Sequence, residues 1–288
     1  MIDNDQEIIA KTHGLNRRQL LRLSSALAAT LTHGGSMLYA FNGLTSATPS
    51  STRGRRLAIP AKPAPIDIDL SATAMIVIDM QNDFVSKGGM LDRLGIDISM
   101  IQHAVPPIAS VIAAARQLGV TVIYLKMAFK QDLSDVGPVN SPNWTAHHWA
   151  GVGTDVVTPD GHRGRILIRD TWNTAVVAEL KPEPADIEIY KHRYSGFFET
   201  NLDATLKRLR VRYLIVTGCT TSVCVESTIR DAMFLDYSPI LLADCTGEPL
   251  GNDLPRSNYE ASLFVISGRT FGWVSSSALF LESVQRPG

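Results

Sequence analysis

The feature that most constrains the fold is a regular alternation of short apolar runs with stretches whose apolar residues recur at helical spacing. Strands followed by helices, repeated along a chain, predict a parallel sheet that is covered by helices on both faces. We therefore predict a three-layer α/β architecture. The strands are expected at residues 74–78, 120–125, 186–190, 213–216 and 240–243.

Helices are expected at residues 101–118, 171–180 and 202–209. The chain is expected to end in a helix, a short strand near residues 271–274 and a tail. The polar, Gly- and Pro-rich segment 130–163 is too long for a simple connection between two elements. We expect this segment to cover a functional site.

The stretch from Tyr213 to Asp236 places Cys224 where a strand has turned and a helix begins. The start of a helix offers unpaired backbone N–H groups and the positive end of the helix dipole. Both favour the thiolate, which is the nucleophilic form of cysteine. The alternative from this stretch alone is a small buried cysteine that only packs.

Three reactive side chains follow predicted strands. Asp79 follows the first strand, Lys191 the third, and Cys224 lies just beyond the strand at 213–216. Ligands of parallel sheets bind at the carboxyl ends of the strands, so these side chains are expected to meet there. A thiol, a carboxylate and an ammonium supply a nucleophile, a general acid–base and a stabilising charge. Taken singly, the aspartate has an alternative role in a turn, and the lysine one on the solvated surface.

The amino-terminal segment differs from the rest. Two arginines, Arg17 and Arg18, precede a modest apolar stretch and small residues, as in a twin-arginine export signal. We therefore interpret residues 1–56 as a signal peptide with a linker, and residues 57–288 as the folded domain. The stretch 45–65, which is rich in Ser, Thr and Pro, is interpreted as linker sequence around this boundary. The expected location is the periplasm. An amphipathic helix or a disordered extension on a cytoplasmic protein is the alternative.

Composition excludes several classes of partner. An apolar fraction of 45% supports a sizeable core. A net charge of −1 and an isoelectric point near 6.7 give no electrostatic basis for binding nucleic acid. The three cysteines have no paired CxxC spacing, and no apolar run is long enough for stable membrane insertion.

Three motifs carry a family resemblance: IVIDMQNDF from Ile76, KHRYSGFF from Lys191 and GCTTSVCVESTIRDA from Gly218. In this order they resemble the isochorismatase-like cysteine hydrolases, over roughly residues 66–283. The branch they resemble most is that of the ureidoacrylate amidohydrolases and the related biuret hydrolases. The resemblance implies the isochorismatase-like fold, with a six-stranded parallel sheet, and an Asp–Lys–Cys triad on the three residues named above.

The resemblance also implies a mechanism. A cis peptide is expected before Thr220, and the N–H groups of Thr220 and Cys224 are expected to form an oxyanion hole. The implied activity is cleavage of a C–N bond in a small ureido compound or amide through a thioester. Phe84, Tyr194 and Glu248 are the candidate substrate contacts. The ureidoacrylate branch carries His-Gln where this chain has Gly-Glu248, which favours a substrate that is cationic or rich in N–H donors.

Neither a metal nor another cofactor is expected, because residues 126–129 lack the Asp-x-His of the related nicotinamidases. The resemblance suggests a homo-oligomer, a dimer or a tetramer. Two other functions stay open: a non-catalytic exported protein that binds small molecules, and a redox protein that pairs Cys219 with Cys224. Of the histidines at 147, 148 and 192, most are expected to face solvent.

Overall fold

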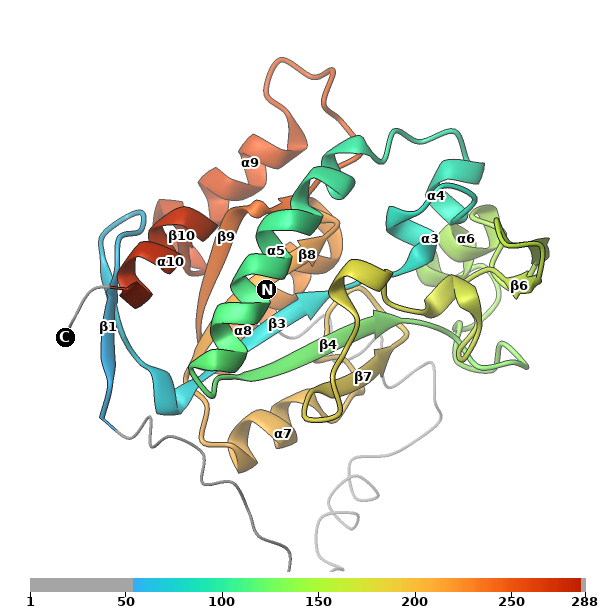
Figure 1. Ribbon diagram of the computed structural model, residues 1–288. Coiled ribbons are helices and arrows are strands. Elements are labelled where there is room, and N and C mark those ends of the chain that lie inside the picture. Colours follow the sequence, from blue (N-terminus) through green and yellow to red (C-terminus); the bar gives the residue numbers. More distant parts are fainter. Residues whose placement is uncertain (1–53, 286–288) are drawn as a thin grey trace, which may run out of the picture. The chain divides into compact units, whose positions relative to one another are not determined.

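The computed structural model describes residues 54–285, except for the side chains of residues 269 and 270. Its centre is a six-stranded sheet with the order β10-β9-β8-β3-β4-β7, in which all neighbouring strands are parallel (Figure 1). This confirms the predicted α/β class and parallel sheet. The strands are β3 (Thr73–Ile78), β4 (Thr121–Met127), β7 (Ile187–Lys191), β8 (Tyr213–Cys219), β9 (Ser238–Gly247) and β10 (Trp273–Ser275).

The strands are continuous apolar runs because both faces of the sheet are covered. In β3 every residue is buried, and alternate side chains enter different cores. Met75 and Val77 belong to the core that also holds α5 (Ser99–Gln117) and Phe280 of α10 (Ser277–Gln285). Ala74, Ile76 and Ile78 belong to the core built with α7 (Leu202–Arg208) and α8 (Glu226–Phe234).

The order of the strands reverses direction at β3. From β3 the chain moves outward through β4 to β7, then returns to β8 on the other side of β3 and continues to β9 and β10 (Figure 1). Such a switch point opens a crevice beyond the carboxyl ends of the two central strands. The loops after β3 and β8 therefore flank the expected ligand site.

An antiparallel hairpin of β1 (Arg56–Ile59) and β2 (Ile66–Asp69) precedes the sheet. Part of the stretch predicted as a linker is thus a strand. Leu57 and Ile59 alternate with the exposed Arg56 and Ala58, point inward and join the core. The strand was missed because its alternation of buried and exposed residues spans only four positions in a stretch rich in proline.

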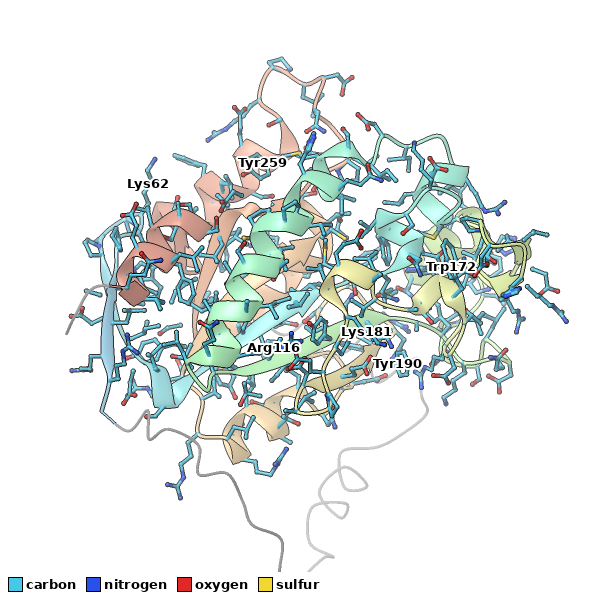
Figure 2. All side chains as sticks on the ribbon, in the orientation of Figure 1. Lys62, Arg116, Trp172, Lys181, Tyr190 and Tyr259 are labelled. Atoms are coloured by element: carbon cyan, nitrogen blue, oxygen red, sulfur yellow. The ribbon has the colours of Figure 1, made fainter. Side chains whose placement is uncertain are left out.

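The helix predicted at 171–180 is wrong. This segment forms two single turns of 3-10 helix, η2 (Trp172–Thr174) and η3 (Ala178–Leu180). Between them Val177 donates its N–H to Met80, and the carbonyl of Ala175 accepts from Asn82. The carbonyl of Trp172, a residue labelled in Figure 2, accepts a hydrogen bond from the side-chain amide of Asn82 at 2.8 Å. These bonds replace the intrahelical ones.

The predicted carboxyl-terminal tail is also wrong, because residues 277–285 form α10. Within residues 54–285 no helix has both the length and the apolar character needed to cross a bilayer. The remaining elements are η1 (Leu70–Ala72), α3 (Asn82–Val85), α4 (Met90–Arg93), α6 (Pro142–Trp149), β5 (Asp155–Val157), β6 (Arg163–Arg165), the π-helical turns η4 (Thr221–Val225) and η5 (Ile266–Thr270), and α9 (Asn258–Val265).

Candidate active site

Asp79 lies directly after β3 at the switch point and is 1% exposed. Its φ of 54° places it in the left-handed region, which is uncommon for a residue with a side chain. Its Oδ1 accepts the backbone N–H of Met127 at 2.9 Å, and its own N–H donates to Leu125. The end of β4 therefore fixes both the backbone and the carboxylate of Asp79.

Lys191 is the last residue of β7, two strands away from β3, and is fully buried. Adjacent strands are about 4.8 Å apart, so an extended lysine can cross β4 to reach the end of β3. Lys191 pairs in register with Met127, and its Nζ lies 2.8 Å from Asp79 Oδ2. The ammonium also donates to the carbonyl of Arg193 at 3.3 Å. The two charged groups therefore form a buried ion pair.

Cys224 lies in the π-helical turn η4, between the end of β8 and the start of α8. Its side chain is buried and lies close enough to Asp79 and Lys191 for both to influence its pKa. The three residues predicted from the ends of separate strands thus meet at one edge of the sheet. The predicted position of Cys224, after a strand and before a helix, is confirmed.

Burial dominates the acid–base properties of these groups. It raises the pKa of Asp79, although the Lys191 ammonium opposes the shift. Burial also raises the pKa of Cys224 to about 12, with Lys191 acting to lower it and Asp79 to raise it. This direction is opposite to the preference for a thiolate that was expected from the start of the helix.

The turn that carries Cys224 begins with a cis peptide bond between Cys219 and Thr220. This feature was expected from the family resemblance and is confirmed. The carbonyl of Thr220 then accepts the N–H groups of Val223 and Val225. Cys219 is buried and donates its thiol to the carbonyl of Asp79 at 3.2 Å, and both Cys219 and Cys224 are free thiols.

Comparison with known proteins gives a match to the isochorismatase domain over residues 73–278. The chain belongs to the isochorismatase family. It is 40% identical over 226 residues to the ureidoacrylate amidohydrolase of Variovorax paradoxus, covering 78% of this chain and 86% of that protein. It is also 40% identical to the ureidoacrylate amidohydrolase of Caulobacter vibrioides strain CB 15 over 222 residues, covering 77% and 95% of the two chains.

Among solved structures, the chain resembles a cysteine hydrolase from Pseudomonas syringae pv. phaseolicola with a TM-score of 0.63 and 29% identity, covering 81% and 98% of the two chains. An N-carbamoylsarcosine amidase from Thermoplasma acidophilum shares the fold, with a TM-score of 0.53, 23% identity and 71% and 96% of the chains covered. The ureidoacrylate amidohydrolases at 40% identity identify this isochorismatase-family chain as a hydrolase of C–N bonds that acts on a small molecule.

The three candidate substrate contacts lie in different surroundings. Phe84 is 8% exposed and packs in the core on α3, shortly after Asp79. Tyr194 is 38% exposed, and burial together with the nearby Cys224 raises its pKa, so its ring borders the triad. Glu248 is fully buried, and its carboxylate accepts the backbone N–H groups of Ser222 and Leu250. Contact of these three residues with a substrate remains a prediction.

Two residues near the triad were not singled out as functional. Gln81 is fully buried; its Oε1 accepts the N–H of Met127 at 2.8 Å and its Nε2 donates to the carbonyl of Met127 at 3.0 Å. It therefore holds the same strand end that holds Asp79. The sequence signal that could have indicated Gln81 is its position two residues after Asp79, directly following a fully apolar strand.

His147 is the second such residue, and it is a buried one among the three histidines of which most were expected to face solvent. It lies on α6, in the segment predicted to cover the site, and is 6% exposed. Its ring contacts Phe129 edge-on at 4.9 Å and lies 5.9 Å from the ring of Tyr194. Desolvation lowers the pKa of His147, with Lys191 acting in the same direction. Burial thus disfavours the charged form of an imidazole that packs against Phe129 and Tyr194.

A polar cavity of about 550 Å³ opens next to the end of β7. His192 and Arg193, which follow Lys191, form part of its wall together with Lys130 and Asp135 from the covering segment. Residues 54–285 contain no group of three or more His, Cys, Asp or Glu side chains arranged to hold a metal ion. The site offers a thiol, a carboxylate and an ammonium as its reactive groups.

Proposed function

We propose that this chain is a cysteine amidohydrolase that cleaves a C–N bond of a small ureido compound or amide through a thioester intermediate. The observation that carries the proposal is the buried ion pair of Asp79 and Lys191, at 2.8 Å, with the buried thiol of Cys224 close enough for both to influence its pKa. The ureidoacrylate amidohydrolases at 40% identity support the ureido class of substrate.

In the first step the Asp79 carboxylate takes the proton of the Cys224 thiol as sulfur attacks the substrate carbonyl. The raised pKa of Asp79 suits it to this role, because a stronger base accepts the thiol proton more readily. Lys191 stabilises the negative charge that passes between carboxylate and sulfur. The tetrahedral oxyanion is held by the backbone N–H groups of Thr220 and Cys224.

The C–N bond then breaks, and Asp79 returns the proton to the departing nitrogen. This leaves an acyl or carbamoyl thioester on Cys224 and releases an amine or ammonia. In the second half Asp79 removes a proton from water, which attacks the thioester carbonyl. Breaking of the C–S bond and reprotonation of sulfur release the acid and restore the free thiol.

The proposal is tested by Cys224→Ala with an ammonia-release assay on ureidoacrylate, biuret, allophanate-like ureas and simple amides. Loss of the nucleophile is expected to lower kcat/KM by about a thousandfold or more. Circular dichroism and thermal melting check that the variant is folded. Turnover at the wild-type rate by folded Cys224→Ala would refute the mechanism, whereas thermal stabilisation by these compounds without turnover in the wild type would favour the binding-protein alternative.

Export and assembly are further parts of the proposal. The twin-arginine motif at Arg17 and Arg18 lies outside the described residues, and the sequence alone supports export to the periplasm. Amino-terminal sequencing of the periplasmic protein is expected to find a start near Thr48. A dimer or tetramer is expected in light scattering of the purified protein.

A further inference from the structure

Glu248 is a buried carboxylate that pairs with backbone rather than with a basic side chain. It directly follows β9 and is fully buried, and within the described residues 54–285 it forms no ion pair with a lysine, arginine or histidine. A buried charge is costly unless it is compensated. Its Oε2 accepts the N–H of Ser222 at 2.7 Å, and its Oε1 accepts that of Leu250 at 3.1 Å.

Ser222 lies in the middle of the turn that carries the two proposed oxyanion donors, Thr220 and Cys224. Strands β8 and β9 shift register between Val216 and Gly218 and then pair again at Gly218–Thr246 and Cys219–Gly247, which brings the start of this turn beside Glu248. A second side-chain bridge crosses the same gap, where the hydroxyls of Thr221 and Thr246 lie 2.9 Å apart. Thr246 in β9 and Glu248 just after it therefore hold two successive residues of the turn, Thr221 and Ser222.

The backbone that presents Glu248 is itself fixed. A Cβ on the preceding residue, Gly247, would lie 2.6 Å from Cα of Ile101, so β9 approaches α5 too closely for any other residue there. The Asn252 amide donates to the carbonyl of Glu248 at 2.8 Å. The carboxylate is therefore a rigid acceptor, and a hydrogen bond to a charged acceptor is about twice as strong as a neutral one.

We propose that Glu248 is a positioning residue, which holds the turn 220–224 so that the N–H groups of Thr220 and Cys224 converge on the developing oxyanion. This inference rests on the proposed function. The N–H of Ser222 is bonded to Glu248 and is withheld from the substrate. The effect on the reaction passes through the backbone of the turn and needs no contact between Glu248 and substrate.

Two substitutions of Glu248 distinguish the effect of its side-chain length from the effect of its negative charge. Glu248→Gln keeps the length and an oxygen acceptor for Ser222 but removes the charge. It gives up the bond to Leu250, a residue that is 50% exposed. Glu248→Asp keeps the charge but is one methylene shorter, so the carboxylate no longer spans the gap to Ser222. Positioning through the hydrogen bond predicts that the glutamine variant works and the aspartate variant does not.

Two readouts are measured on the full-length protein: steady-state kinetics on the best compound of the panel above, and hydrogen exchange of a peptide that contains Ser222. For Glu248→Asp we expect kcat to fall about tenfold to a hundredfold with KM within about threefold, because oxyanion donors act in the transition state. Exchange at Ser222 is expected to quicken about tenfold, while the amides of β3 stay protected. Glu248→Gln is expected to remain within about threefold of the wild type in both readouts.

The matched control is Glu226→Asp, the same shortening on α8, where the carboxylate pairs with Arg230 and Ser262 and does not touch the turn. Its kcat is expected to stay within about twofold of the wild type. Unchanged kcat and unchanged Ser222 exchange in Glu248→Asp would overturn the positioning role, and so would a glutamine variant as impaired as the aspartate one. Inactive Cys224→Ala with fully active Glu248→Asp would refute only this inference, whereas active Cys224→Ala would refute the proposed function itself.

Discussion

Asp79 combines three constraints on one residue. It takes a left-handed backbone conformation, accepts the N–H of Met127 and pairs with Lys191 inside a water-excluded site. Positive φ at a residue with a side chain persists only where the surroundings hold it. Here the surroundings are the end of β4 and the ammonium, so the carboxylate faces sulfur in one fixed orientation.

Asp79→Asn is expected to affect alkylation and turnover in opposite directions. The carboxylate raises the pKa of Cys224, so its removal lowers that pKa and increases the thiolate fraction at a given pH. We therefore expect iodoacetamide to label Cys224 faster in the variant, at a pH from about 7 to 9, while ammonia release is lost with the general base. In the wild type, labelling is expected to keep rising with pH beyond the range of a free thiol. Slower labelling in the variant, measured by mass spectrometry of the Cys224 peptide, would contradict the assignment.

At the scale of elements, Asp83 joins the helices after β3 to Leu167 and Asn173, which follow the segment 130–163 along the chain. Its Oδ1 accepts from the N–H of Met90, at the start of α4, and from the Asn173 amide, and its Oδ2 accepts from the N–H of Leu167. Asp83 is fully buried, and burial raises its pKa to about 6. One carboxylate thus connects three separate pieces of chain.

This carboxylate makes stability depend on pH. Its pKa is about 6 in the folded state and 3.8 in the reference state, so between these values the folded protein binds more protons than the unfolded one. The contribution of Asp83 to the unfolding free energy is therefore largest below about pH 4 and decreases as pH rises to about 6, by on the order of 3 kcal/mol. Urea unfolding of wild type and Asp83→Asn at several pH values isolates this term, because all other groups are shared. A difference between the two that stays constant from pH 4 to 7 would contradict the raised pKa.

The sequence was most informative where burial was complete. The all-apolar runs of β3 and β8 were predicted because a strand covered on both faces leaves no other pattern, and the meeting of Asp79, Lys191 and Cys224 followed from the shared edge of a parallel sheet. The short 171–180 segment was predicted wrongly because its apolar spacing suits a helix, whereas the N–H and carbonyl groups between its two turns are used by residues 80–82. Tertiary hydrogen bonds of this kind leave no periodic signal.

The acid–base properties of the site were harder to predict than its geometry. The start of a helix argued for a thiolate at Cys224, but the degree of desolvation depends on everything packed around the sulfur. The partners of Glu248 were invisible for the same reason, since Ser222 lies 26 residues away in sequence. Local sequence shows which groups are present, and long-range packing decides their charge and contacts.

At the scale of the folded unit, the two ends of the described chain are joined. Lys62 exchanges backbone hydrogen bonds with Val274 in β10, and the hydroxyl of Ser275 donates to the carbonyl of Pro60 at 2.6 Å. The Arg55 guanidinium donates to the carbonyl of Val284 in α10 at 2.8 Å. The family match ends short of these contacts at the amino-terminal side, since it starts at residue 73. The hairpin and the residues that follow it therefore lie against the edge strand β10 and against α10.

A chain that begins at residue 65 is expected to be less stable than one that begins at residue 54. It lacks β1 with its buried side chains Leu57 and Ile59, which corresponds to about 3–6 kcal/mol of lost burial. Because the triad residues lie after β3, at the end of β7 and in η4 rather than on β10 or α10, kcat is expected to stay within about twofold at a temperature where both chains are folded. Thermal melting and ammonia release measure the two effects, and equal melting temperatures would show that the hairpin adds nothing to stability.

The reversal of strand order at β3 has a consequence for how this family diversifies. The proposed reacting atoms lie at or just beyond strand ends, whereas the segment 130–163, predicted to cover the site, is part of the long connection between β4 and β7. We expect exchange of that connection to alter which molecules enter without moving sulfur, carboxylate or ammonium. New specificity can therefore arise by insertion or replacement in one loop, while the bond-breaking apparatus is inherited intact.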